Sequence, residues 1–227
     1  MRNPLTLLAK AWRLLAQEGP AAVLRRVRSL AWRRWEYVVF RKVLGEEVAG
    51  ALQVDVEFRV AGPEDIPWIS RQIDHLTDAQ AERLLKEQFQ GRDITVVGVS
   101  AGAEPGLMFS AWLSHDGLDL RALGDRVGPD DVSIRRVEVP ERCRRRGLAT
   151  RGMRFAEQAA WKAGRRRIWS LVLTDNVASL GLHQKLGYED RGRVRLVRWF
   201  GKCYVRTRLA GDLRWSKVRV ANDVSKL

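Results

Sequence analysis

The sequence predicts an α/β protein built on a mixed sheet, with a helical extension in front of it. Short apolar runs with strand-like patterning are interleaved with runs whose apolar residues recur at helical spacing. A strand, a helix and a second strand follow one another over residues 134–174, which implies two parallel strands and a right-handed crossover. The 227 residues suffice for one domain of about 150 residues and an appendage.

Residues 1–45 are predicted to form a basic amphipathic helical extension. Asn3 can cap a first helix that Gly19 ends, and Pro20 can start a second. An apolar stripe follows the second helix through Val38, and the segment holds ten basic residues against two acidic ones. Such a helix suits an anionic membrane surface, and it equally suits packing on the main domain or on another subunit.

The first half of the domain is predicted to contain three strands and two helices. The alternation of Val54–Val60 predicts a strand, and helical spacing predicts a helix at Pro63–Leu76. A capping-box pattern starts a further helix over residues 77–89. A glycine- and proline-containing link joins two apolar runs, which predicts an antiparallel hairpin of Ile94–Ser100 and Leu107–Ser114.

The second half of the domain is predicted to contain, in order, a strand, a helix, a strand, a short helix and a hairpin. The long helix is traced by one face of small and apolar residues, namely Leu148, Gly152, Phe155, Ala156, Ala159 and Ala163. The other elements are strands Ile134–Val139 and Ile168–Thr174, a helix at Asn176–Leu186, and a hairpin of Val194–Phe200 and Lys202–Arg208. The domain is therefore predicted to span residues 54–210, followed by a weakly structured tail at 211–227.

Composition excludes several classes of protein. No uncharged apolar run approaches the roughly 18 residues that a membrane span needs, and the apolar stretch Leu5–Ala9 is too short for a signal peptide. Two cysteines, Cys143 and Cys203, cannot make a disulfide framework or a four-ligand zinc site, so no metal is expected. A reducing, cytoplasmic setting is the simplest interpretation. The net charge of +14 favours anionic partners.

The stretch from Val137 to Thr150 has the pattern of an anion site. A strand ends, a basic loop turns through Gly147 and a helix begins, so free backbone N–H groups meet the positive end of the helix dipole. Arg144, Arg145 and Arg146 add charge and forked donors. A phosphate group is the natural ligand, although a solvated basic loop at an ordinary helix start would share this pattern.

Two motifs together resemble the GNAT acyltransferase superfamily. Arg144-x-x-Gly147-x-Ala149 after an apolar strand resembles its pyrophosphate-binding motif. The run from Asn176 to Tyr188 resembles its second motif, an Asn followed by a short helix and a closing Lys-Leu-Gly-aromatic. The order of elements across the predicted domain also matches, whereas residues 1–45 and the tail have no counterpart.

The resemblance implies a GNAT-like sheet whose central strands, Ile134–Val139 and Ile168–Thr174, splay apart around acetyl-CoA. It implies that loop N–H groups hold the pyrophosphate and that main-chain groups of the first strand hold the pantetheine arm. Asn176 would face that arm, and it can equally act as a plain helix N-cap. The implied cofactor-binding residues are Val137, Val139, Arg144, Arg145, Arg146, Gly147, Leu148, Ala149, Thr150, Asn176 and Ser179.

Two side chains are candidates for proton transfer. The family often places a Tyr on the second-motif helix as general acid, and this chain has His183 there, which can donate a proton near neutral pH. Its alternative is an ordinary half-exposed helix residue. Glu138 lies beside the expected thioester site and can serve as general base, or it can pair with a nearby arginine. Cys143 is not assigned as a nucleophile, because amine acetylation needs no covalent intermediate.

The predicted function is acetyl transfer from acetyl-CoA to a primary amine. An arginine-rich final hairpin (Arg191, Arg193, Arg195, Arg198) suggests an anionic acceptor, such as an amino sugar on a nucleotide or lipid carrier. The extension would then bring a cytoplasmic enzyme to the inner membrane surface. A protein or peptide amine is the rival acceptor. A non-catalytic module that binds CoA, lipid or nucleic acid is the alternative class, although no nucleic-acid-binding motif supports it.

Overall fold

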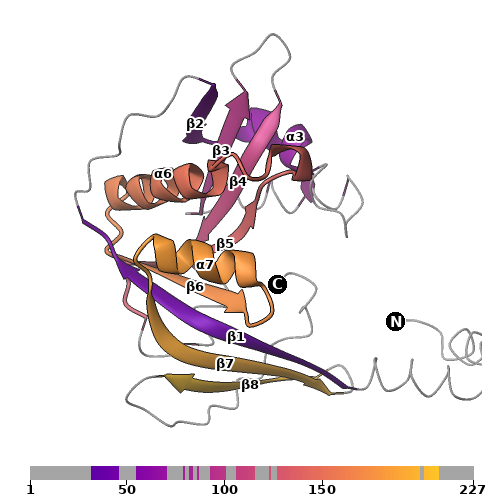
Figure 1. The fold of residues 1–227 in the computed structure, drawn as a ribbon, viewed down its shortest axis with the longest axis vertical. Helices are drawn as coiled ribbons and strands as arrows, with labels where there is room; N and C mark the ends of the chain where they lie inside the picture. Colours follow the sequence, from indigo (N-terminus) through magenta and orange to yellow (C-terminus); the bar gives the residue numbers. More distant parts are fainter. Residues whose placement is uncertain are drawn as a thin grey trace, which may run out of the picture. The chain divides into compact units, whose positions relative to one another are not determined.

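The computed structural model describes residues 32–45, 55–70, 79, 82–83, 86, 93–100, 106–115, 123, 127–199 and 202–209. Within them, eight strands form one sheet in the order β2-β3-β4-β5-β6-β1-β7-β8 (Figure 1). The chain divides into two compact units, one of residues 37–193 and one that combines residues 1–36 and 194–227. The predicted mixed α/β sheet is confirmed.

From β2 onward most bounds lie within about three residues of the predicted ones, but β7 begins five residues before the predicted Val194, and only residues 63–70 of the helix predicted at Pro63–Leu76 are described. The strands are β1 Trp32–Val43, β2 Val56–Val60, β3 Ile94–Ser100, β4 Leu107–Ser114, β5 Asp131–Glu138, β6 Arg167–Leu173, β7 Glu189–Trp199 and β8 Lys202–Leu209. The α-helices are α3 Ile66–Ser70, α6 Leu148–Lys162 and α7 Val177–Lys185, and the 3-10 turns are η1 Pro63–Asp65 and η3 Glu141–Cys143. The tail and most of the helix predicted over residues 77–89 lie outside the described residues.

Strands β5 and β6 are parallel, as predicted, but they pair only at their first residues. The partners are Asp131 with Arg167, Val132 with Ile168 and Ser133 with Trp169, and no further pair joins the two strands. Beyond Ser133 the two strands separate, which confirms the expected splay. Along its other edge, β6 pairs with β1 as far as Leu173. The gap left by the splay therefore lies between β6 and β5 only.

A buried carboxylate holds the closed end of this splay. The Asp131 side chain is fully buried and accepts hydrogen bonds from Arg167 Nε at 2.6 Å and Trp169 Nε1 at 2.9 Å. It also accepts one from the Gly128 amide at 2.9 Å. Because three donors converge on one desolvated group, the start of β5 is fixed to the start of β6.

The prediction of a helix through Val38 was wrong for residues 32–45. These residues form β1, which lies antiparallel to β6 inside the sheet (Figure 1). Val38, Val39 and Phe40 are consecutive β-branched or aromatic residues, and all three are at most 5% exposed. A central strand buries both faces and so accommodates such a run, whereas a helix with one apolar face does not. A surface helix that contacts a membrane therefore cannot include this part; residues 1–31 lie outside the described residues.

The strand β1 also brings a buried ion pair to the domain. Lys42 Nζ lies 2.8 Å from Glu157 Oε2 on α6, and both side chains are largely buried. The Lys42 ammonium also lies 5.8 Å from the centre of the Tyr188 ring. A domain boundary at residue 45 is consequently incorrect, because residues before it belong to the core that carries α6 and α7.

Helices α6 and α7 cover one face of the sheet (Figure 1). The buried face of α6 consists of Leu148, Gly152, Met153, Ala156, Glu157 and Ala160, so it is rotated relative to the predicted stripe. A Cβ atom added at Gly152 would lie 2.5 Å from the Phe109 ring, which shows how closely α6 approaches β4. The other face of β4 packs through Trp112 against Ile66 and Ile69 of the α3 region.

Candidate functional site

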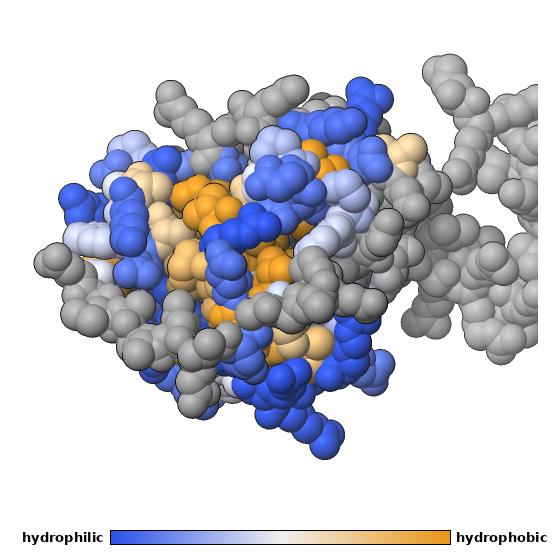
Figure 2. All heavy atoms as spheres, turned by 90° about the horizontal axis from the view of Figure 1, so that it is seen from above, coloured by the Kyte–Doolittle hydropathy of each residue, from blue (hydrophilic) through white to orange (hydrophobic). Residues whose placement is uncertain are grey.

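A cleft of about 1350 Å³ lies at the open side of the splay. Its walls come from the end of β5, the loop into α6, the helix α7, and the start of β4 with Trp68 beside it. Most of the predicted cofactor residues line it, namely Val137, Val139, Arg144, Arg145, Gly147, Leu148, Ala149, Thr150, Asn176 and Ser179, together with Glu138. The described surface seen from above combines apolar patches with hydrophilic side chains around them (Figure 2).

The loop into α6 has the geometry of an anion site. Gly147 is the N-cap of α6 with a φ of 72°, and Arg145 also has a left-handed φ of 63°. The first helical amide to bond within α6 is that of Arg151, to the Gly147 carbonyl, so the amides of Leu148 to Thr150 have no intrahelical acceptor. A Cβ atom at Gly147 would meet nothing within 4 Å, which leaves these donors accessible from the cleft.

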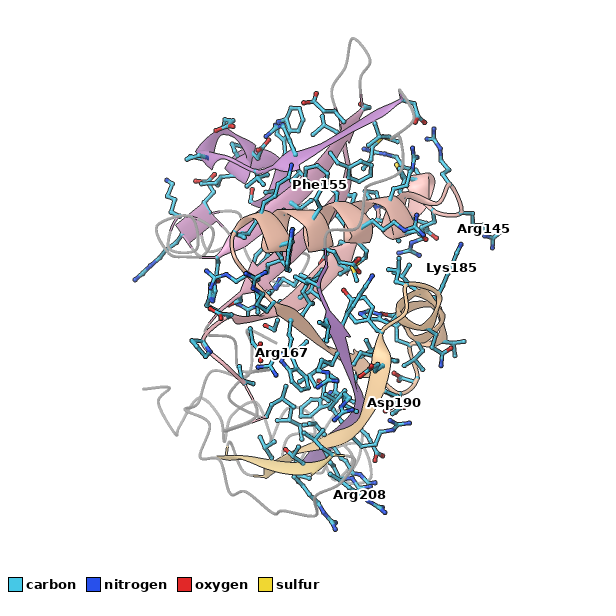
Figure 3. The ribbon with its side chains drawn as sticks, turned by 90° about the vertical axis from the view of Figure 1, so that its left-hand side faces the viewer. Arg145, Phe155, Arg167, Lys185, Asp190 and Arg208 are labelled. Atoms are coloured by element: carbon cyan, nitrogen blue, oxygen red, sulfur yellow. The ribbon has the colours of Figure 1, made fainter. Side chains whose placement is uncertain are left out.

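Cations from two elements face the cleft. Arg144 and Arg145 come from the loop and Lys185 from the last turn of α7. Figure 3 shows Arg145 and Lys185 projecting toward the same opening from the loop and from α7. Arg146, in contrast, does not line the cleft, because its guanidinium group lies 3.3 Å from Asp55. The structure therefore does not place Arg146 among the residues that line the cleft, and its ion pair joins the loop to the segment before β2.

Asn176 combines the two roles that the sequence left open. Its side chain accepts a hydrogen bond from the Ser179 amide at 3.1 Å, so it is the N-cap of α7. It also lines the cleft. Leu186 and Tyr188, which close the same motif, are buried in the core.

A bulge in β5 presents Glu138 to the cleft. The register with β4 runs from Ser110–Glu138 to Trp112–Arg135, so β5 contains one extra residue there. Arg136, within this bulge, has a φ of 51°, which is an unfavourable backbone conformation for a residue with a side chain. The edge of β5 that faces β6 has no strand pairing beyond Ser133, so main-chain groups around Val137 lie outside a ladder at the splay.

His183 does not lie on the cleft, contrary to the expectation that it reaches the reacting thiol. It is 2% exposed, and its ring stacks on Phe40 at 5.1 Å. Its Nδ1 lies 2.8 Å from the Ser179 carbonyl oxygen and donates to it, while Nε2 is buried without a hydrogen-bond partner. Burial lowers the pKa of His183, and the hydrogen bond to Ser179 opposes that effect in part.

Helix geometry explains this placement. Residues turn by about 100° each along an α-helix, so Ala178, Leu182 and Lys185 share one face, and all three line the cleft. His183 is about 140° away from Ala178 around the helix axis. The same spacing identifies Lys185 as a cleft residue that the sequence analysis missed. Trp68 and Leu107 were missed as well, because only the tertiary fold brings them to the cleft, whereas Arg142 lies within the predicted loop and was not assigned.

The His183→Phe substitution is expected to reduce the acid sensitivity of the fold and to leave turnover within a few-fold of wild type. Since the folded-state pKa is below the ordinary value of 6.5, the unfolded chain binds the proton more readily. The stability of the wild type is therefore fully present above pH 6.5 and falls below it, by up to about 1.4 kcal/mol per pH unit until the folded-state pKa is reached. Melting temperatures from pH 5 to pH 8 measure this difference. A large loss of turnover with unchanged acetyl-CoA affinity would instead indicate that His183 acts as a general acid in the reaction.

The arginines of β7 whose side chains are described form ion pairs with carboxylates away from the cleft. Arg193 lies 2.8 Å from Asp190, Arg195 lies 3.3 Å from Glu36, and Arg191 lies 3.7 Å from Glu189. None of the three lines the cleft, and the Arg198 side chain lies outside the described part. The expectation that this hairpin faces an anionic acceptor thus receives no support from these contacts.

Neither a metal site nor a membrane span is found in the part of the chain that the structure describes. No group of three or more His, Cys, Asp or Glu in those residues is arranged to hold a metal ion. Among the described helices, none has the length and apolar character needed to cross a membrane.

Comparison with known proteins identifies a related domain. Residues 108–188 match the family model described as Acetyltransferase (GNAT) family. These residues run from β4 to the end of the second motif and thus include the loop, the splay and α7. No curated protein matches the chain significantly.

Solved structures share the fold at low sequence identity. A GCN5-related N-acetyltransferase from Sphaerobacter thermophilus has a TM-score of 0.57 at 12% identity, over 80% of this chain and 57% of that one. A GCN5-related N-acetyltransferase from Kribbella flavida has a TM-score of 0.50 at 16% identity, over 79% and 62%. The structure of AAC(6')-Iy in complex with the bisubstrate analogue CoA-S-monomethyl-acetylneamine has a TM-score of 0.51 at 19% identity, over 60% and 92%. The chain spans 57–66% of the length of the first three structures matched.

Proposed function

We propose that this chain, whose residues 108–188 match the model of the GNAT acetyltransferase family, transfers an acetyl group from acetyl-CoA to a primary amine. The observation that carries this proposal is the convergence on one cleft of the glycine-bent loop and the splayed strands. The loop supplies unpaired amides and cations, which is the donor set that a diphosphate requires.

Different groups of the chain would bind the diphosphate of acetyl-CoA and orient its amide-containing arm. The amides of residues 147–150 would hold the diphosphate, with Arg144, Arg145 and Lys185 supplying positive charge around it. Main-chain groups of Val137 and Val139 would pair with the amide-containing arm along the open edge of β5. Asn176 and Ser179 would border that arm from α7. Bound acetyl-CoA supplies the activated thioester.

Glu138 is the proposed general base. It would accept a proton from the acceptor ammonium group, directly or through water, because only the neutral amine is nucleophilic. The amine nitrogen then forms a bond to the carbonyl carbon, the carbon–sulfur bond breaks with its electron pair leaving on sulfur, and the nitrogen loses its excess proton to solvent. An N–H donor of the β5 edge would stabilise the charge that develops on the carbonyl oxygen, an effect typically worth several kcal/mol. His183 is too deeply buried to protonate the thiolate, so we assign that step to solvent.

An amino sugar is the acceptor that we propose. Trp68 borders the cleft beside Leu107, and an indole ring offers a flat apolar surface to the C–H face of a pyranose. The ligand of AAC(6')-Iy named above contains acetylneamine, which is consistent with such an acceptor on this fold. A protein amine has less support, because arginines and Lys185 around the cleft repel lysine-rich peptides.

Acetylation of an amine panel, followed as free thiol release, tests the proposal. The Glu138→Gln variant is expected to lower kcat by about 10²- to 10⁴-fold while retaining the affinity for acetyl-CoA. Glu141→Gln is the matched control, since Glu141 also lines the cleft but lies beyond the end of β5, and it should retain turnover. Absence of thiol release with every amine, or full activity of Glu138→Gln, would contradict the assignment.

A further inference from the structure

We propose that Arg145 and Lys185 bind the 3′-phosphate on the ribose of acetyl-CoA and make the protein selective for the 3′-phosphorylated cofactor. This inference rests on the proposed function, which places the diphosphate of the same molecule on the loop into α6. It adds a second phosphate site at the mouth of the cleft, formed by one side chain of the loop and one of α7.

Arg145 and Lys185 lie on two different walls of the cleft. Arg145 belongs to the loop into α6, Lys185 is the last residue of α7, and both line the cleft. Both residues are exposed, and their side chains project toward the same opening (Figure 3). Because like charges that face one opening attract an anion jointly, a phosphate group there would be contacted from both walls.

Neither of these two cations forms an ion pair with a described residue. The neighbouring arginines show the contrast, since Arg146 and Arg151 reach the same carboxylate, that of Asp55, at 3.3 Å and 3.4 Å. The charges of Arg146 and Arg151 are thus compensated within the chain. Those of Arg145 and Lys185 remain available to a ligand.

The two arginines at the start of this loop are directed differently. Arg144 donates a hydrogen bond through Nε to the Val139 carbonyl oxygen at 3.3 Å, so its side chain lies against the end of β5. Arg144 has an extended backbone, with a φ of −65° and a ψ of 164°, whereas Arg145 has a left-handed φ of 63°. The change of backbone conformation turns Arg145 away from β5, toward the mouth of the cleft.

The length of α7 places Lys185 at the adenosine end of the cofactor. Asn176 and Ser179, at the beginning of this helix, are the proposed neighbours of the amide-containing arm. The helix has nine residues, which correspond to about 13 Å along its axis. Since the sulfur of the cofactor is directed to Glu138, α7 extends from the arm toward the mouth, where the ribose and its phosphate lie.

The charge of the cofactor calls for these additional cations. The free amides of Leu148 to Thr150 and the helix dipole suit the diphosphate. A phosphate monoester carries a further charge of about −1.5 to −2 near pH 7 and has three acceptor oxygens. An arginine supplies a planar fork of donors and a lysine a compact charge, so the pair of Arg145 and Lys185 matches such a group.

A comparison of CoA with 3′-dephospho-CoA tests the inference, because the two molecules differ only in this phosphate. Binding to the full chain is measured by titration calorimetry at about 0.15 M salt, where the Debye length is about 8 Å and distant charges contribute little. We expect the wild type to bind CoA at least about tenfold more tightly, as charge-assisted hydrogen bonds imply. With the acetylated forms, the difference should appear in KM rather than in kcat, since the phosphate is remote from the thioester.

Variants of the two cations locate the effect. Arg145→Gln and Lys185→Gln should each weaken the binding of CoA by about three- to tenfold and leave that of 3′-dephospho-CoA within about twofold. The double variant should have no preference. A lysine that merely compensates the carbonyl end of α7 would stabilise the helix equally with either ligand, so its loss would not change the ratio of the two affinities.

Two residues of α6 provide matched controls. Lys162 is also an exposed lysine in the last turn of a helix, and Arg154 is an exposed arginine, but neither lines the cleft. Lys162→Gln and Arg154→Gln remove the same charges and should retain the full preference for CoA. The Tm of each variant without ligand shows that it is folded.

Three results would overturn the inference. The wild type could bind CoA and 3′-dephospho-CoA equally, the two variants could retain the full preference, or they could lose affinity for both ligands to the same extent, which would assign the cations to the diphosphate. Each of these leaves the proposed function standing, because the cofactor still binds. Absence of binding of both CoA and 3′-dephospho-CoA to the wild type would contradict the proposed function and the inference together.

Discussion

Removal of residues 1–45 is expected to prevent folding, whereas removal of residues 1–31 is expected to leave a cooperatively folding domain. The longer deletion takes away β1, with Val39 at 0% and Phe40 at 1% exposure, and exposes the edge of β6. It also leaves Glu157 buried without Lys42, and the loss of one partner of a buried ion pair alone costs about 3–5 kcal/mol. That cost is a large fraction of the stability of an ordinary domain.

Circular dichroism and thermal unfolding of the two deletions measure this difference. The Lys42→Met variant in the full chain serves as a milder version, because it removes the same charge without removing the strand. A cooperative transition in the chain that begins at residue 46 would contradict the placement of β1 in the core. Loss of structure on removal of residues 1–31 alone would show that the domain needs residues before β1 in order to fold.

Gly147→Glu is expected to abolish the rise in Tm that acetyl-CoA produces in the wild type. A side chain at a φ of 72° is strained, and the added carboxylate would lie among the amides that an anion needs. A ligand at 1,000 times its Kd stabilises a protein by about 4 kcal/mol. The wild-type shift should therefore amount to several degrees and should be lost in the variant.

Gly164→Glu provides the matched control for this substitution. Gly164 has a φ of 80°, and its added Cβ would also meet nothing within 4 Å, but it lies at the opposite end of α6. Both variants should lose similar stability without ligand, and only Gly164→Glu should retain the response to acetyl-CoA. An undiminished response in Gly147→Glu would reject the loop as the diphosphate site.

Local patterns predicted most of the domain because they depend on residues adjacent in sequence. The strand Ile94–Ser100 and its hairpin with Leu107–Ser114 have the predicted bounds, since their alternation and their turn are local features. The loop through Gly147 was predicted for the same reason, because a glycine between a strand end and a helix start is the local pattern of a turn that needs a positive φ. Ten of the eleven predicted cofactor residues line one cleft.

The errors arose where the outcome depends on tertiary packing. The run Val38–Phe40 is apolar in every register, so its periodicity cannot distinguish a helix stripe from a strand buried on both faces. The side of α7 on which His183 lies depends on how the helix is rotated on the sheet. The contact of Arg146 with Asp55 joins residues 91 positions apart, and the bulge at Arg136 becomes visible only from the register with β4.

A crystal structure of the protein with bound CoA would test the central claim most directly. We predict that the diphosphate lies against the amides of residues 147–150 and that the pantetheine arm runs between β5 and β6, with its sulfur close to Glu138. A diphosphate bound elsewhere on the chain, or an arm that does not enter the gap between these two strands, would contradict the account.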